Sequence, residues 1–300
     1  MDPRAAKLRR LLRNRAAGAA LVVVGALVLL AAAAPALAPH PVATQHPESI
    51  NARPGGGFPL GTDGLGRDIG SRLLFGARVS LAVGLLSQVV VLVVGVPVAL
   101  AAGYFRGRVD GVLMQSVDVM LAIPDLLFVI VCTTLVNGLV EGSRGGPLLS
   151  LGEFNRGTSG VPALVVVVGL TGWLALARLL RGQILALGQH EFVAAARALG
   201  VGAGRVMSRH LLPNVLDTII VTVTLGIPRA IFLEAALSFL GLGIQPPTPS
   251  WGTMIADGVQ SMRFTPHVVL APSLALAATM LAFNFLGDGL RDAFDPHMPT

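Results

Sequence analysis

Six long apolar runs, separated by short polar connections, dominate the chain. Four of them contain no charged residue and cover 16–37, 79–105, 157–177 and 264–287. Two others, at 112–136 and 216–240, are apolar apart from a few isolated charges. About 20 mostly apolar residues make a helix long enough to cross the hydrocarbon core of a bilayer. The pattern therefore predicts an all-α integral membrane protein with six transmembrane helices.

The composition agrees with a chain that is surrounded largely by lipid. Of its 300 residues, 53% are hydrophobic and only 13% are charged, whereas a soluble domain carries about a quarter charged residues. The net charge of +6 does not predict a nucleic-acid partner, because the basic residues stand in the short connections between apolar runs. The single cysteine, Cys132, lies inside an apolar run, so we expect neither an intrachain disulfide nor a zinc site of several cysteines.

The scarcity of lysine excludes one class of enzyme. The chain has 21 arginines and a single lysine, Lys7. A phosphate-binding P-loop needs a lysine directly after its glycines, where it reaches the β- and γ-phosphates. No glycine-rich loop precedes Lys7. If ATP drives this protein, another chain must hydrolyse it.

The first apolar run resembles a signal peptide in some respects. It follows a basic start, and Ala36-Leu37-Ala38 is a possible cleavage site. We favour a retained helix, because the apolar core is longer than the roughly 7–15 residues of a signal peptide. In addition, Pro39 follows the site directly.

The basic residues also predict the orientation. Fourteen arginines and lysines lie in segments on the N-terminal side of the membrane and seven on the other side, with Arg229 inside a span. The positive-inside rule then places both termini in the cytoplasm. The expected segments are a cytoplasmic tail 1–15, a first helix 16–38, an external loop 39–78, a five-helix core 79–290 with a cytoplasmic loop 182–214, and a cytoplasmic tail 291–300.

The cytoplasmic loop is too long to be structureless in a compact protein. Apolar residues recur at helical spacing over 190–199 and Gly200 follows, which predicts a short helix with a glycine stop. A second short helix is expected over 205–212, before Pro213 leads into the fifth span. Periodicity alone leaves two interpretations open, a docking surface or a loop packed on its own helix ends.

Particular residues of this loop resemble the EAA loop of binding-protein-dependent ABC importer permeases. That pattern is Glu-Ala-Ala, three residues, Gly, nine residues, and an apolar-x-Leu-Pro ending. Ala195, Ala196, Gly200, Leu212 and Pro213 fall in register with it. Two positions depart from it, since Ala194 replaces the Glu, with Glu191 three residues earlier, and His210 replaces the apolar residue.

Three further stretches are similar to the second, C-type permease of the peptide and nickel branch of that family, at 59–68, 234–252 and 284–292. The resemblance extends over about residues 5–297 and implies a type I ABC importer permease fold. It implies a bacterial cytoplasmic-membrane complex with a homologous six-helix permease and two ATP-binding subunits. Those subunits would use ATP and Mg²⁺, and this chain would bind no cofactor. An extracytoplasmic substrate-binding protein would deliver a peptide.

Isolated charges inside the apolar runs are candidates for residues that face the pore or a partner subunit. Asp118 and Asp125 are seven residues apart and would share one helix face. They could instead pair with loop arginines near the cytoplasmic end. Arg229 and Glu234 are about 140° apart around a helix and are poorly placed to pair with each other. Trp251 begins an amphipathic stretch. It could lie at the outer membrane–water interface, or it could face the binding protein.

Two other function classes are less compatible with the sequence. An ion-coupled secondary transporter usually has internal repeats, and no convincing repeat is found. An intramembrane enzyme would need catalytic motifs, but H-E-x-x-H and G-x-S-x-G are both absent from the sequence. Within the importer class, nickel, glutathione or haem are alternative cargoes to peptides.

Overall fold

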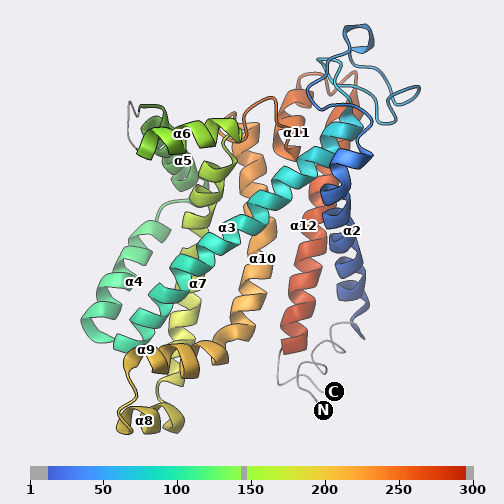
Figure 1. Ribbon diagram of the computed structural model, residues 1–300. Coiled ribbons are helices and arrows are strands. Elements are labelled where there is room, and N and C mark those ends of the chain that lie inside the picture. Colours follow the sequence, from blue (N-terminus) through green and yellow to red (C-terminus); the bar gives the residue numbers. More distant parts are fainter. Residues whose placement is uncertain (1–12, 143–146, 295–300) are drawn as a thin grey trace.

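The computed structural model describes residues 13–142 and 147–294. Most of the two expected tails, including Lys7, lies outside the described residues. Arg144 also lies outside them. Within them, long helices form an elongated bundle that carries a loop-rich lobe at one end and a pair of short helices at the other (Figure 1). The lobe is residues 39–68, and we call these two ends the lobe end and the α8 end.

Five long helices correspond to five of the predicted spans and are apolar enough to cross a membrane. Their bounds are α2 (Arg15–Leu37), α3 (Ile69–Phe105), α7 (Val161–Leu187), α10 (Leu212–Phe239) and α12 (Pro266–Phe294). α2 begins and α12 ends at the α8 end of the bundle (Figure 1). The prediction of an all-helical membrane-spanning chain is therefore confirmed for these segments.

Three of these helices extend well beyond the apolar runs. α3 begins at Ile69, so residues 69–78, expected in the external loop, are helical. The reason is Asp68, whose carboxylate accepts hydrogen bonds from the backbone N–H groups of Gly70 (3.2 Å) and Ser71 (3.0 Å) and so caps the helix. α7 continues to Leu187 and α12 to Phe294.

The third predicted span is broken. It consists of α4 (Gly107–Leu121) and α5 (Asp125–Gly142), which are bent by 96° where they meet. Pro124 lies in the break, and a proline disfavours helical geometry in the residue before it. The bend corrects the prediction that Asp118 and Asp125 share one helix face, since Asp118 lies on α4 and Asp125 begins α5. Counted with this pair, the described residues contain up to six segments long and apolar enough to cross a membrane.

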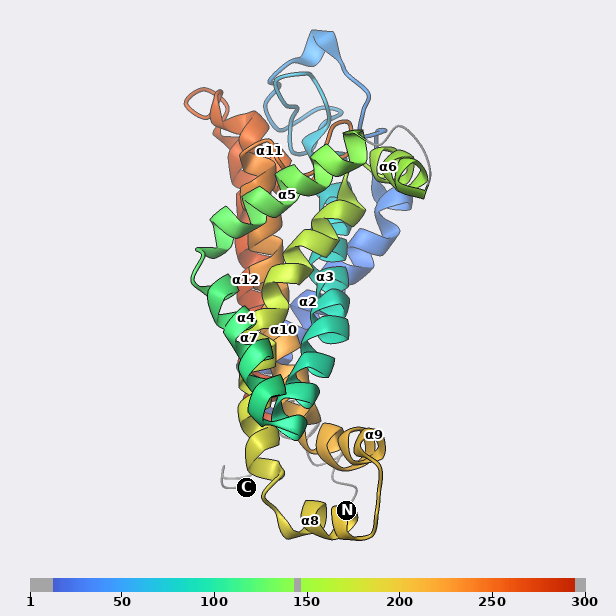
Figure 2. The ribbon, with the colours of Figure 1, turned by 90° about the vertical axis from the view of Figure 1, so that its left-hand side faces the viewer.

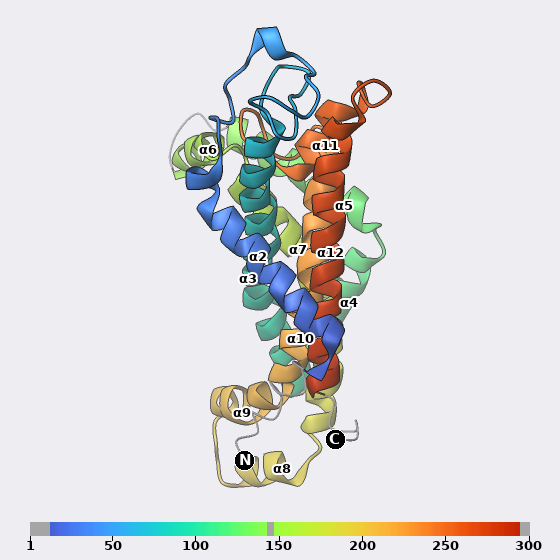
Figure 3. The same ribbon diagram turned by 90° about the vertical axis from the view of Figure 1, so that its right-hand side faces the viewer.

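Close contacts between helices hold the bundle together. α3 packs along α7, α10 lies against α3 and α12, and α2 lies beside α12 (Figure 3). Glycines let the backbones approach: a Cβ atom on Gly84 would come within 2.6 Å of Ile231, and one on Gly169 within 2.4 Å of Val90. Small residues at helix contacts are typical of membrane bundles, where close packing replaces the hydrophobic effect between helices.

Shorter helices occupy the two ends. At the lobe end lie a 3₁₀ turn (Pro47–Ser49), α6 (Pro147–Gly157) and α11 (Trp251–Val259). At the other end lie α8 (Glu191–Ala198), α9 (Ala203–Val206) and a π-helical turn (Met207–Leu211). Figure 2 shows α5 crossing over α7 toward the lobe end, while α8 lies beyond the opposite end of the bundle.

Candidate functional site

The first candidate site is the pair of short helices at the α8 end. Val193 is fully buried and Ala196 is 7% exposed, and both pack onto a core formed with α7 and α10. The opposite face of α8 is open, and it carries Glu191, Phe192, Ala194 and Ala195. The loop thus packs on its own helix ends, as one interpretation of the sequence expects, and its other face is exposed. Whether that face is a docking surface stays a prediction.

Gly200 ends α8, as the sequence predicts. Its φ is +74°, a conformation that glycine adopts without a steric penalty. The Gly200 N–H donates to the carbonyl of Arg197 (3.0 Å), and the Val201 N–H donates to the carbonyl of Ala196 (3.1 Å). This is the Schellman arrangement that commonly terminates helices. A Cβ atom on Gly200 would have no atom within 4 Å, so the backbone conformation, and not crowding, requires glycine in this chain.

The second short helix differs from the prediction. Instead of an independent helix over 205–212, α9 continues through the π-helical turn directly into α10. Pro213 lies two residues after the π-helical turn and has no N–H group to donate to a carbonyl within it. Leu211 is buried in the same core as Val193, whereas His210 and Leu212 are partly exposed. Because π-helical turns are rare and concentrate at functional sites, this turn marks a candidate hinge.

A cation–π contact joins α8 to the end of α3. The guanidinium of Arg197 lies over the ring of Tyr104, 4.6 Å from its centroid. Nearby, Arg106 donates to the carbonyl of Leu185 (3.2 Å) and so joins the end of α3 to α7. The first contact therefore joins α8 to α3, and the second joins α3 to α7.

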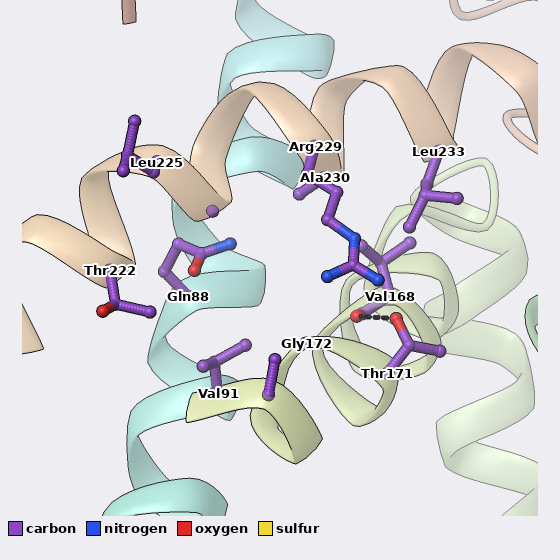
Figure 4. Close-up of a pocket in the computed structure, with 12 residues that line it drawn as sticks. Gln88, Val91, Val168, Thr171, Gly172, Thr222, Leu225, Arg229, Ala230 and Leu233 are labelled. Carbon is purple, nitrogen blue, oxygen red and sulfur yellow. Dashed lines mark hydrogen bonds between the residues drawn. The ribbon is translucent and has the colours of Figure 1, made fainter. Parts of the chain in front are cut away.

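The second candidate site is a cavity of about 230 Å³ between α3, α7 and α10 (Figure 4). Its walls are mostly aliphatic, with a few polar side chains. The Arg229 side chain reaches from α10 toward Thr171 and Val168 of α7 (Figure 4). The lining residues are Gln88, Val91, Val168, Thr171, Gly172, Ala175, Thr222, Leu225, Gly226, Arg229, Ala230 and Leu233.

Two ion pairs join the broken span to the bundle. Arg229 of α10 pairs with Asp125, and Arg178 of α7 pairs with Asp118. All four side chains are between 43% and 60% exposed. Both acids therefore have arginine partners, and these partners come from membrane helices. Arg229 does not pair with Glu234, in agreement with their expected separation around the helix.

Glu234 faces neither a pore nor a partner, which corrects the expectation for this residue. Its side chain is fully buried and accepts hydrogen bonds from the hydroxyls of Ser80 and Ser238, each at 2.8 Å. Ser238 in turn accepts the N–H of Ile244 (3.1 Å), and Ser80 accepts the N–H of Trp251 (3.4 Å). The carboxylate thus holds both ends of the connection between α10 and α11.

Trp251 is also buried, contrary to both sequence interpretations. It is 1% exposed, and its indole N–H donates to the carbonyl of Leu73 (3.2 Å). Gly252 lets α11 approach α10, because a Cβ atom there would lie 2.5 Å from Cα of Ala235. The stretch 234–252 is therefore a packing unit, whose glycines, serines and tryptophan hold α11 against α10.

A network of four charges, three of them buried, anchors the lobe. The Arg67 guanidinium contacts Asp63 at 2.7 Å and Asp257 at 2.8 Å. Arg72 contacts the same two carboxylates at 3.6 and 3.2 Å. The lobe, the first turn of α3 and α11 are thereby joined. Three of these side chains are at most 10% exposed, and Asp257 is 45% exposed.

The comparisons with known proteins decide the family. Residues 95–299 match the family of binding-protein-dependent transport system inner membrane components, and residues 5–54 match the N-terminal transmembrane domain of oligopeptide transport permease C. The dipeptide transport system permease protein DppC of Bacillus subtilis is 38% identical over 97% of this chain and 84% of its own length. The chain belongs to the binding-protein-dependent inner membrane component family.

Two more relatives have different names but similar coverage. The oligopeptide transport system permease protein OppC of Bacillus subtilis is 35% identical over 95% of this chain and 87% of its own length. The glutathione transport system permease protein GsiD of Pectobacterium atrosepticum is 38% identical over 97% of this chain and 90% of its own length. The short helices α8 and α9 lie within residues 95–299, which match the family of inner membrane components. The residues that line the cavity lie there too, except Gln88 and Val91 of α3.

Several residues that shape the two candidate sites and the lobe were not predicted from the sequence. Ser80 and Gln88 stand in the apolar run 79–105, where a polar side chain is itself a signal that a partner is needed. Asp257 is an isolated acid in an amphipathic stretch. The sequence offers no local indication that Asp257 meets Arg67, because 190 residues separate them.

Proposed function

We propose that this chain is the permease subunit of an ATP-driven importer that carries di- or oligopeptides across the bacterial cytoplasmic membrane. The observation that carries the proposal is the extent of similarity to permeases named for dipeptide and oligopeptide transport, which covers 95–97% of this chain. Glutathione is a second candidate cargo, because a relative named for glutathione transport is equally identical. Glutathione is itself a tripeptide, so one pore chemistry serves both.

The proposed complex contains four kinds of partner. A homologous six-helix permease completes the pore, two ATP-binding subunits hydrolyse ATP with Mg²⁺, and an extracytoplasmic substrate-binding protein delivers the cargo. Membrane lipid surrounds the bundle. This chain supplies no catalytic group and binds no nucleotide, and the lack of a P-loop lysine in its sequence supports this assignment.

The free surface of α8 supports contact with an ATP-binding subunit. Phe192 and Leu199 are 42% and 84% exposed at the tip of the bundle, and exposed apolar groups at one place favour a protein partner. In this arrangement the α8 end, with both termini, is cytoplasmic and the lobe is extracytoplasmic. The fourteen-to-seven distribution of basic residues supports the same orientation.

Crosslinking within the assembled importer tests the proposal. A cysteine at Ala194 or Ala195, on the open face of α8, should crosslink to a cysteine in the ATP-binding subunit. A cysteine at Ser116 on α4 should not, which makes it the matched control. The chain purified alone should hydrolyse no ATP above background. Reporter fusions at Met1 and Thr300 should both report a cytoplasmic location.

Two results would contradict the proposal. Robust ATP hydrolysis by the rigorously pure chain would show that it is not a passive subunit. An α8 surface that never crosslinks, in a complex that transports peptides, would show that the ATP-binding subunit docks elsewhere.

A further inference from the structure

The cavity between α3, α7 and α10 contains a charged side chain, Arg229, which is unusual so far inside a membrane-spanning helix. Arg229 lies ten residues before the end of α10 at Phe239, which is about 15 Å along a helix. That distance is about half the hydrocarbon thickness of a bilayer. A charged side chain at this depth is costly, and such residues usually face protein or a water-filled path and carry function.

The guanidinium of Arg229 is only partly used by the protein. Among the described residues its one hydrogen-bonding partner is Asp125, which it reaches through a single terminal nitrogen. A guanidinium has five N–H donors in a planar fork that suits a carboxylate. Since the side chain is 45% exposed, the remaining donors are accessible from the cavity.

Other groups around the cavity leave room for a polar guest. The amide of Gln88, from α3, lies against α10 because residue 226 is glycine, and a Cβ atom there would come within 2.4 Å of the amide oxygen. Its amide nitrogen makes only a long hydrogen bond to Ser87, at 3.4 Å. The cavity volume of about 230 Å³ is far larger than the roughly 10–15 Å³ that one water molecule needs. That space fits one end of a peptide.

We propose that Arg229 binds the C-terminal carboxylate of the transported peptide, which replaces Asp125 as the partner of the guanidinium. This inference rests on the proposed function and identifies the group of the substrate that this chain recognises. Every linear peptide with a free C-terminus carries a carboxylate, whatever its side chains, so the contact suits a carrier of many sequences. The released Asp125 lies beside the guanidinium, where it restores the pair when the peptide leaves.

Uptake by the complete importer in proteoliposomes tests this role. The probes are dialanine and its C-terminal amide, which differ only in the carboxylate. Arg229→Gln should lower dialanine uptake by about ten- to a hundredfold, the usual worth of a charge-assisted hydrogen bond. Uptake of the amide should change by less than about threefold. Because all variants receive the same substrate-binding protein, its own preference cancels when variants are compared.

Two matched variants separate recognition from structure. Asp125→Asn breaks the same ion pair but keeps the cation, so dialanine uptake should stay within about threefold of the unmodified importer. Arg178→Gln removes the similarly exposed arginine of the other ion pair and should lower dialanine and amide uptake to the same extent. Arg229→Lys keeps the charge and should recover part of the dialanine uptake.

Three outcomes overturn the inference. Equal losses for Arg229→Gln and Asp125→Asn would mean that the ion pair is only structural. Equal losses of both probes with Arg229→Gln would mean that the carboxylate is not recognised there. If Arg229→Gln no longer co-purifies with the second permease, the residue belongs to the subunit interface. Failure of the unmodified importer to take up any peptide would instead refute the proposed function.

Discussion

The lobe end and the α8 end of the bundle are held in opposite ways. At the lobe end, polar contacts join the lobe, α3, α10 and α11: Arg67 and Arg72 lie between two carboxylates, and Glu234 holds both ends of the connection to α11. At the α8 end, two small apolar residues and one cation–π contact attach a helix whose other face is open. The lobe end is joined by more polar contacts to its neighbours than α8 is.

The glycines illustrate this difference. A Cβ atom would meet backbone at 2.4 Å on Gly61 and at 2.2 Å on Gly66, both in the lobe. On Gly200, Gly202 and Gly204 it would meet nothing within 4 Å. At Gly61 and Gly66 both crowding and a positive φ favour glycine, whereas at Gly200 the positive φ alone does. Glycine-rich motifs that look alike in sequence thus have different physical reasons.

The largest effect is expected from breaking the charge network of the lobe. Arg72→Ala leaves Asp63 and Asp257 with one cation fewer and should lower the free energy of unfolding by about 3–5 kcal/mol, as for other broken buried ion pairs. Thermal denaturation of the purified complex measures this loss. Arg78→Ala is the control, since Arg78 is exposed on the same helix and should change stability by less than about 0.5 kcal/mol. Equal effects of the two variants would contradict the anchoring role of the network.

A pair of glycine substitutions compares the two ends directly. Gly252→Ala places a methyl group 2.6 Å from the carbonyl oxygen of Ala235 and should cost about 1–3 kcal/mol through overpacking. Gly204→Ala adds the same methyl group in open space within α9 and should be neutral or stabilising by up to about 1 kcal/mol. Thermal denaturation of both variants decides. If Gly252→Ala is as stable as Gly204→Ala, the lobe end is not tightly packed.

Much of this architecture could be predicted from the sequence because its signals are local. An apolar run long enough to cross the hydrocarbon core indicates a membrane span, whichever segments it packs against. Five of the predicted spans are long apolar helices, as expected. Gly200 as a helix stop is likewise encoded by its immediate surroundings. Pro124 indicates that the third span can kink, but the sequence does not predict a bend of 96° there, because a proline in a membrane helix is often tolerated when neighbours satisfy the freed groups.

The site residues that were misplaced depend on distant partners. Glu234 looked like a pore residue because a carboxyl inside an apolar run suggests function. Its hydrogen-bond partner Ser80 is 154 residues away, so the sequence could not show that it is satisfied within the chain. Trp251 was assigned to a surface for the same reason, since its partner Leu73 is 178 residues away. Asp125 and Arg229 stayed plausible as functional residues, but their pairing became visible only in three dimensions.

The joint of α8 should be sensitive to backbone conformation alone. Gly200→Val puts a β-branched residue at a φ of +74° and should cost about 1–2 kcal/mol locally. The chain should still insert and assemble, while peptide uptake per ATP hydrolysed falls. Gly200→Asn is the matched control, because asparagine tolerates this conformation better. Normal coupling in the valine variant would show that the Schellman turn is not needed for transmission.

The smallest effect is expected at the contact between α8 and α3, and it tests how loosely the α8 end is attached. Arg197→Gln removes the cation from the ring of Tyr104 and should cost only about 0.5–1 kcal/mol, because the contact is exposed. The loss should appear as faster amide hydrogen exchange in residues 191–198, with no change in the melting temperature of the bundle. Tyr104→Leu should have the same effect, and combining the two changes should add little, since both remove one interaction. A lower melting temperature for Arg197→Gln would mean that α8 is part of the rigid bundle, and the contrast between the two ends would disappear.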